Sequence, residues 1–208
     1  MCGQYLIEID ESELRDIVDA VEKKTQEPEP DQMQIDLGFS GVIRPTDRAP
    51  VLLSKRGALI ATVMKWGYPG YPDRRFPSRK PAPLFNAKSE TAVTLNTWRN
   101  DLATRRCIVP SSGFFEWQHG GADKTKYLFR LPGENVLYMA GIYKAFLGPD
   151  GVVRPHFSIL TTAANKSMCD VHSRMPVVLR KGEFDEWLYG DYMSKFKRED
   201  LYLERSAA

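Results

Sequence analysis

The chain has 208 residues, 42% of them hydrophobic, and its 29 basic and 27 acidic residues leave a formal net charge of +2. This composition suits one domain with a core of ordinary size, and it requires any polyanion-binding site to be a local cluster. Three widely spaced cysteines, with no secretory leader pattern and no membrane-length apolar run, predict a reduced, cytoplasmic protein without a disulfide framework.

The first predicted element is a helix over residues 10–24. Asp10 and Glu13 make a capping pair at its start. The apolar residues that follow share one helical face: Leu14, Ile17, Val18 and Val21. Two prolines in the segment 27–31 predict the end of the helix in an acidic loop.

From residue 49 onward the pattern is typical of strands, because short β-branched or aromatic segments alternate with Gly, Pro or Asp turns. The predicted strands span 49–53, 59–65, 107–109, 114–117, 127–130, 136–143, 157–160 and 176–179. Two further helices are expected, at about 94–102 and 181–189. Many short strands and few helices favour an α+β fold. We expect a single domain over 1–208, mainly an antiparallel sheet folded into a barrel-like core with a few flanking helices.

One segment, 71–83, carries four basic residues and one acidic residue, with prolines and aromatic rings between them. It is either a solvated basic loop or a track for a phosphate backbone beside rings on which bases stack. Further cations that could extend such a track follow along the chain: Arg105, Arg106, Lys166, Arg174, Arg180 and Lys181.

Cys2 combines two nucleophiles once Met1 is removed. An α-amine titrates at about 7.7–8.0 and a thiol near 8.5, so both are partly reactive at neutral pH. The amine condenses with an aldehyde to a Schiff base, and the thiol then closes a five-membered thiazolidine. The alternative is a buried cysteine that opens a first strand.

Glu116 is a carboxylate among aromatic residues. Period-2 alternation places Phe114 and Glu116 on one strand face, with Phe115 and Trp117 on the other. We expect this carboxylate to be hard to ionise and suited to general acid–base catalysis. The alternative is a strand-end glutamate paired with Arg or Lys.

Two other polar residues are ambiguous when each is taken alone. His172 suits a hydrogen-bonded structural histidine, and Asn86 suits a turn or a helix cap. Both residues belong to a set of five segments whose order along the chain favours a functional interpretation. The segments are 1–3, 66–68, 86–91, 106–117 and 172–176. In these segments the sequence resembles the SOS-response-associated peptidase (SRAP) family, the abasic-site-shielding proteins.

The resemblance implies a role for each matched residue. Cys2 would capture the ring-opened aldehyde of an abasic site in single-stranded DNA and end as a thiazolidine. Asn86 would hold the sugar and the amine, and Glu116 would shuttle the proton for carbinolamine dehydration. His172 would assist ring opening and, in some members, slow reversal. The fold, the SOS or DNA-damage role and a nucleoid-associated location follow from the same resemblance.

DNA contacts are also implied. Lys88, Thr161 and Arg174 match positions that contact phosphates, and Gly3 belongs to the matched N-terminal segment. Pro45 and Tyr71 lie near the point where the family wedges the strand apart. No metal or other cofactor is expected, and we expect a monomer whose partner is single-stranded DNA containing abasic sites. Gln4 and Lys88 stand where the family usually has arginine, and Lys88 keeps the charge but loses the bidentate fork.

Two other functions stay open at this point. Cys2 could be the nucleophile of an autoproteolytic thiol peptidase, with His172 and Asn86 completing the set. The chain could instead be a non-covalent reader of damaged or modified DNA, with Cys2 chemically inert.

Overall fold

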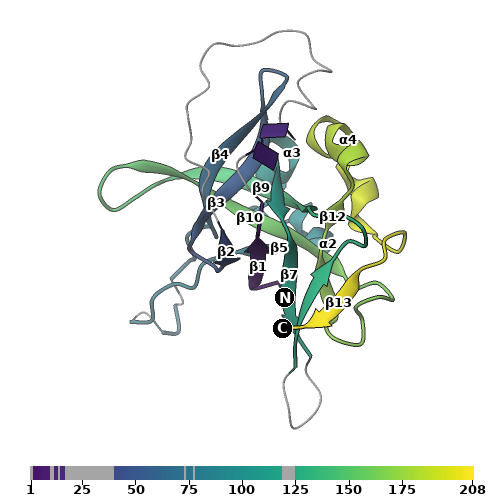
Figure 1. Cartoon of the computed structure of the whole chain (residues 1–208). Coiled ribbons are helices and arrows are strands. Elements are labelled where there is room, and N and C mark those ends of the chain that lie inside the picture. Colours follow the sequence, from purple (N-terminus) through teal and green to yellow (C-terminus); the bar gives the residue numbers. More distant parts are fainter. Residues whose placement is uncertain are drawn as a thin grey trace.

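The centre of the molecule is a ring of five strands (Figure 1). The computed structural model describes residues 2–9, 12–13, 15–16, 40–72, 74–76, 78–118 and 125–208. The ring consists of β3 (Arg48–Lys55), β4 (Ala58–Trp66), β6 (Arg106–Ser111), β9 (Leu137–Leu147) and β10 (Val153–Ala163). Its strand order is β10-β4-β3-β6-β9, and β9 pairs back onto β10. The predicted α+β fold with a barrel-like sheet is confirmed; the β4–β10 pairing is parallel, and the other ring pairings are antiparallel.

Local chemistry and side-chain packing explain the ring. Arg56 and Gly57 both have positive φ, 52° and 88°, which matches the two-residue hairpin turn that joins β3 to β4. Trp66 is fully buried, with the Tyr5 ring at 5.0 Å and the Phe157 ring stacked at 6.3 Å between centroids. Aromatic burial of this size stabilises the closed sheet by several kcal/mol, about 1.5–3 for each fully buried large side chain.

A second sheet carries the N-terminal strand, in the order β13-β8-β7-β1-β2. Its strands are β1 (Gln4–Ile7), β2 (Gly41–Ile43), β7 (Gly113–Trp117), β8 (Lys126–Arg130) and β13 (Glu204–Ala207). Three short strands extend the ring: β5 (Asn86–Lys88) and β11 (Arg174–Pro176) flank β10, and β12 (Val178–Leu179) pairs with β9. The second sheet thus places the start of the chain beside β7, which carries Glu116.

The helices within the described residues are short. They are α2 (Ser89–Ala92), α3 (Arg99–Thr104) and α4 (Phe184–Tyr189), with the 3-10 turns η1 (Lys181–Glu183) and η2 (Tyr192–Phe196). The helix expected at 181–189 is confirmed as η1 followed by α4. The helix expected at 94–102 is wrong at its start, because residues 94–98 are not helical and α3 begins at Arg99.

Most of the predicted helix 10–24, and the acidic loop 27–31, lie outside the described residues. Residues 12–13 and 15–16 are helical. Among the described residues there is no helix with the length and apolar character needed to cross a membrane.

The predicted strand 176–179 is two strands in the structure. The Val177 amide donates to the Leu160 carbonyl of β10, and the Val177 carbonyl accepts from the Ala140 amide of β9. The segment therefore changes partner from β10 to β9 at this residue, and β11 and β12 are separate elements.

Candidate functional site

Cys2 and Asn86 are in direct contact although 84 positions separate them. The Asn86 side-chain amide Nδ2 donates to the Cys2 carbonyl oxygen at 2.8 Å. Asn86 begins β5, which pairs in parallel with β10 at Ile159. Cys2 is fully buried, and its Sγ donates to the Gln4 carbonyl at 3.7 Å. The structure thus joins the first of the matched segments to the third.

Glu116 reaches the same region through the pairing of β1 with β7. Gln4 lies opposite Phe115, so continuing the antiparallel register by one residue places Glu116 opposite Gly3. The Glu116 residue is only 2% exposed. The predicted alternation is confirmed, because Lys126 Nζ lies 3.8 Å from the Phe115 ring centroid and 5.2 Å from that of Trp117. Lys126 therefore lies on the face of β7 that carries Phe115 and Trp117, and Glu116 points to the other face.

The environment keeps the Cys2 thiol protonated. Burial raises the pKa of the Cys2 thiol far above its usual range, and the negative charge of Glu116 raises it further. A thiol in such a place is neutral at physiological pH, so it acts as a nucleophile only if a neighbour removes its proton or if its partner is strongly electrophilic.

His172 lies half-buried in the turn before β11. The Arg174 backbone N–H donates to His172 Nδ1 at 2.9 Å, and the Arg174 carbonyl oxygen lies 3.1 Å from the same nitrogen. Gln118, one residue after β7, donates through Nε2 to the Asp170 carbonyl at 3.2 Å. This hydrogen bond joins the turn that carries His172 to the end of the strand that carries Glu116.

The implied phosphate contacts occupy neighbouring strands. Lys88 on β5 lies opposite Thr161 on β10, and Arg174 begins the next strand, β11. Lys88 is exposed. Thr161 is fully buried, with its hydroxyl 3.3 Å from Arg174 Nη2, so in this state it supports Arg174 and does not reach the surface.

Glu90 holds Arg174, and sequence reasoning assigned it no role. The two Arg174 Nη groups donate to the Glu90 carboxylate at 2.6 and 2.9 Å, and Nη2 also donates to the Thr161 carbonyl at 2.6 Å. The hydrogen bond from Arg174 lowers the pKa of Glu90. No local pattern could have shown this, because the partners are 84 positions apart.

The described part of the basic loop lies at the surface. Arg74 and Arg79 are exposed, as are the rings of Tyr71 (68%) and Phe76 (57%). Pro45 is half-buried in the turn after β2, where the next residue, Thr46, donates from its backbone amide to the Trp66 carbonyl at 2.9 Å. The turn that carries Pro45 therefore lies beside the end of β4, and Tyr71 follows that strand by five residues along the chain.

Several cations suggested as an extension of this loop have structural partners instead. Arg105 pairs with Asp101, and Arg180 pairs with Asp200. Arg106 donates to backbone carbonyls that include Leu102 and Leu188, both at 2.8 Å. These three guanidinium groups stabilise the fold, because each is engaged by a carboxylate or by the ends of helices.

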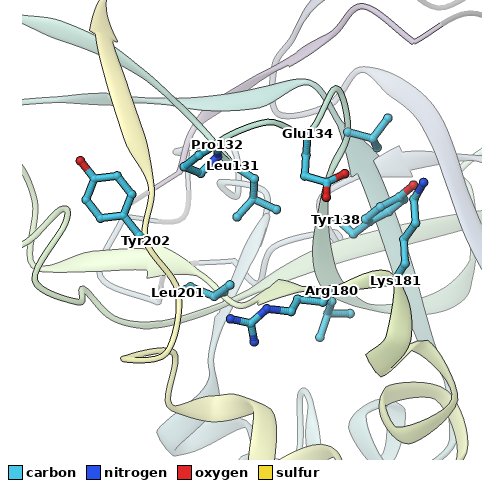
Figure 2. Close-up of a pocket in the computed structure, with 10 residues that line it drawn as sticks. Leu131, Pro132, Glu134, Tyr138, Arg180, Lys181, Leu201 and Tyr202 are labelled. Carbon is cyan, nitrogen blue, oxygen red and sulfur yellow. The ribbon is translucent and has the colours of Figure 1, made fainter.

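The pocket drawn in Figure 2 lies apart from the Cys2 region, and the described residues contain no cluster of metal ligands. Among the described residues, no three His, Cys, Asp or Glu side chains gather as metal ligands. Figure 2 shows a pocket whose lining includes Tyr138, Arg180 and Lys181. The volume of this pocket is about 350 Å³. This pocket shares no residue with the candidate site, which consists of the polar groups gathered around Cys2.

Comparison with known proteins gives a family match over nearly the whole chain. A family model described as "SOS response associated peptidase (SRAP)" matches residues 1–206. The chain is 36% identical over 107 residues to abasic site processing protein YoqW of Bacillus subtilis, covering 50% of this chain and 47% of that protein. It is 28% identical over 193 residues to abasic site processing protein HMCES of Gallus gallus, covering 78% of this chain and 57% of that protein. The chain thus spans about half the length of the curated relatives it matches.

A solved structure shows the same fold. The crystal structure of a protein from Bacteroides thetaiotaomicron superposes with a TM-score of 0.73 at 23% identity, covering 99% of this chain and 91% of that chain. The match to the family model extends over nearly the whole sequence, including all five segments singled out above. The chain therefore belongs to the SOS response associated peptidase (SRAP) family.

Proposed function

We propose that this protein acts on abasic sites in single-stranded DNA during the response to DNA damage. It would capture the aldehyde of the lesion covalently through Cys2 after Met1 has been removed. The observation that carries the proposal is the hydrogen bond from Asn86 Nδ2 to the Cys2 carbonyl, beside the buried Glu116. The family membership and the names of the relatives, abasic site processing proteins, support the same substrate.

The electrostatics of Cys2 favour an order of steps in which the amine attacks first. A neutral, buried thiol is a weak nucleophile, whereas a free α-amine is substantially uncharged near pH 8. The amine adds to the aldehyde carbon to give a carbinolamine, which loses one water to give a Schiff base. The thiol sulfur then bonds to the same carbon and its proton goes to the nitrogen. The net change is aldehyde plus aminothiol to thiazolidine plus water.

Asn86 is placed to orient this reaction. Its Nδ2 fixes the Cys2 carbonyl, and therefore the backbone that carries the amine. Its Oδ1 is buried and has no hydrogen-bond partner among the described residues. That acceptor suits an N–H of the Cys2 amine or a sugar hydroxyl, since a buried acceptor without a partner costs about 1–3 kcal/mol.

Glu116 is placed to move the protons. Carbinolamine dehydration needs an acid that delivers a proton to the leaving hydroxyl, and thiol addition needs a base that receives one. A carboxylate that is 2% exposed exchanges protons with the bound reactants and not with bulk water. His172, whose Nδ1 lies against the backbone of Arg174, would assist opening of the sugar ring.

The exposed side of the site suits a DNA strand. Lys88 and the arginines of the 71–83 loop supply positive charge, and Tyr71 and Phe76 supply exposed rings. Such a combination binds single strands without sequence preference, and its affinity falls as salt rises. An abasic nucleotide has no base to unpair, so the sugar enters a site with little cost in stacking.

The geometry gives less support to a thiol peptidase. Such enzymes need a thiol whose pKa is lowered by a neighbouring base or helix terminus, and burial raises the pKa of Cys2. The Nδ1 atom of His172 already accepts from the Arg174 amide.

The test is a denaturing gel. Purified protein, its loss of Met1 established by intact mass, is mixed with a uracil-containing single-stranded oligonucleotide pretreated with uracil glycosylase. We expect a shifted band that survives denaturant. Cys2→Ala should abolish the band, whereas Cys169→Ala, which alters an exposed free cysteine, should keep it.

Two results would reject the covalent mechanism. One is the absence of any shifted band with protein that begins at Cys2. The other is a band of equal intensity with Cys2→Ala. Retention of undamaged DNA by Cys2→Ala at the wild-type level is expected, since the phosphate contacts lie elsewhere.

A further inference from the structure

Four basic side chains form one row across the barrel, on neighbouring strands. Arg48 on β3 lies opposite Lys65 on β4, and Lys65 lies opposite His156 on β10. His156 in turn lies opposite Lys144 on β9. Side chains directly opposite in a sheet project from the same face, so this cation row occupies one face of the barrel wall.

The cation row is not explained by stability of the fold. Like charges directly opposite one another on a sheet are destabilising. Within the described ranges, Arg48, Lys65 and Lys144 form no ion pair. Burial lowers the pKa of His156, and the charges of Lys65 and Arg154 lower it further. The Arg and Lys side chains of this face therefore add positive charge that no ion pair within the described ranges neutralises.

A pocket of about 230 Å³ opens beside the Lys144 end of this row. Its aromatic wall comes from Tyr68, Tyr71 and Phe146, with the Tyr68 and Phe146 rings 4.9 Å apart between centroids. Asn96 and Lys144 supply an amide and a cation to the lining, and Lys144 Nζ is 5.4 Å from the centroid of Phe146.

The chemistry of these groups suits a nucleotide. Aromatic side chains stack on the face of any base, which makes such binding tolerant of sequence. A side-chain amide forms hydrogen bonds with the edge of a base. Lysine neutralises a phosphate as a point charge. The exposed ring of Tyr71 leaves the wall open to an extended strand.

The pocket is continuous with the candidate site along the chain. Leu84 lines the pocket, and Asn86, two residues later, contacts Cys2. Two residues of extended chain span roughly 7 Å. The Leu84 carbonyl accepts from Ser158 Oγ at 2.6 Å, so β10 fixes the segment that connects the two places.

We propose that the pocket beside Tyr71 and Lys144 binds an intact nucleotide that flanks the lesion, and that Arg48, Lys65 and Lys144 hold the adjacent phosphates. This inference rests on the proposed function in that the same DNA strand occupies both places. The pocket then sets how the strand is positioned before any covalent step, and it acts on undamaged DNA as well.

The experiment measures undamaged single-stranded DNA, so it does not depend on cross-linking. A labelled oligonucleotide is titrated by fluorescence anisotropy against wild type, Lys144→Ala and the matched control Lys197→Ala, an exposed lysine after η2. Lys144→Ala should bind the oligonucleotide about threefold to tenfold more weakly than wild type. The slope of log K against log salt concentration should also be shallower by about 0.7, the value for one lost phosphate contact on a single strand. Lys197→Ala should match wild type.

Stacking is tested at Tyr71. An oligonucleotide with 2-aminopurine beside a tetrahydrofuran lesion analogue, which has no aldehyde, should lose fluorescence on binding wild type and Tyr71→Phe. Tyr71→Ala should bind about tenfold more weakly and restore the fluorescence. Unchanged binding by both Lys144→Ala and Tyr71→Ala would overturn the pocket, as would a wild-type protein that binds no single strand.

The two proposals fail separately. Absence of the denaturant-resistant band with wild type rejects the covalent function and leaves the anisotropy result standing. A normal band with wild-type binding in both variants rejects the pocket alone.

Discussion

The Cys2 site and the cation row differ in how the protein treats polar groups. At Cys2 the polar atoms are buried and joined by specific hydrogen bonds over long sequence separations. On the row and in the described part of the 71–83 loop, most of the cations are exposed to solvent, and Lys65 is half-buried. Buried groups interact strongly in a low dielectric and are insensitive to salt, whereas exposed charges are screened. Under the proposed function, the comparison therefore predicts that the chemistry at Cys2 and the retention of DNA can be separated by mutation.

The largest expected effect separates the two regions at Glu116. Glu116→Gln preserves the shape of the side chain but removes its proton transfer. We expect cross-linking to slow by about 10²–10⁴-fold, the usual contribution of a general acid–base group. Binding of undamaged single-stranded DNA should be unchanged. Single-turnover gels and anisotropy measure the two quantities, and equal losses in both would assign Glu116 a structural role.

Added salt should weaken binding at the exposed cations and leave the covalent adduct at Cys2 unaffected. Raising the salt concentration from about 50 to 200 mM should weaken non-covalent binding about 50-fold if about four phosphates are contacted. The preformed covalent adduct should persist unchanged, because its lifetime depends on bond reversal. Filter retention before and after cross-linking provides the measurement. An adduct that dissociates with added salt would contradict the thiazolidine.

A substitution at Asn86 tests how much the positioning of the Cys2 backbone contributes to the rate of cross-linking. Asn86→Ala removes the hydrogen bond to the Cys2 carbonyl, so we expect cross-linking to be about tenfold slower and the free energy of unfolding to fall by about 1 kcal/mol. Thermal melts and cross-linking rates are the readouts. Thr94→Ala is a suitable control, since that exposed residue is also polar but lies away from Cys2. Equal cross-linking by Asn86→Ala and wild type would remove Asn86 from the mechanism.

The smallest effect concerns Glu90, at the border between the two regions. Glu90→Gln should release Arg174 to bind phosphate and tighten undamaged single-strand binding about twofold to fivefold, the range for one exposed ion pair. Anisotropy detects this change, and weaker binding would show that Glu90 positions Arg174 for DNA.

The same pair has a predicted pH dependence. The hydrogen bond from Arg174 lowers the pKa of Glu90 below its unfolded value of 4.5. Its stabilisation is therefore present above pH 4.5 and is lost as the pH falls through the folded pKa. Melting curves of wild type and Glu90→Gln should thus converge in acid.

Much of the fold could be predicted from local pattern. The expected strands at 49–53, 59–65, 114–117 and 127–130 lie within β3, β4, β7 and β8, because their β-branched and aromatic residues fit a pleated surface. Strands β1, β2, β5 and β13 were not predicted. Each has only three or four residues, and each exists because a neighbouring strand is in place.

Sequence reasoning named candidate residues for the site but could not predict their contacts. Cys2, Asn86, Glu116 and His172 were singled out from residue type and order, and their roles stay proposals. The pairing of Arg174 with Glu90 and the enclosure of Thr161 could not be foreseen, since both depend on β5, β10 and β11 lying side by side.

The sequence alone determined the period-2 alternation at Phe114–Glu116, the family segments and the residue types available for chemistry. Only the tertiary structure decided which cations face solvent and which support the fold. Arg106 was a candidate DNA contact and instead binds helix-end carbonyls, whereas Lys65 and Lys144 carried no sequence signal and share one row. The reason is physical: periodicity fixes which face a side chain takes within its own strand, but strand register decides what lies opposite it.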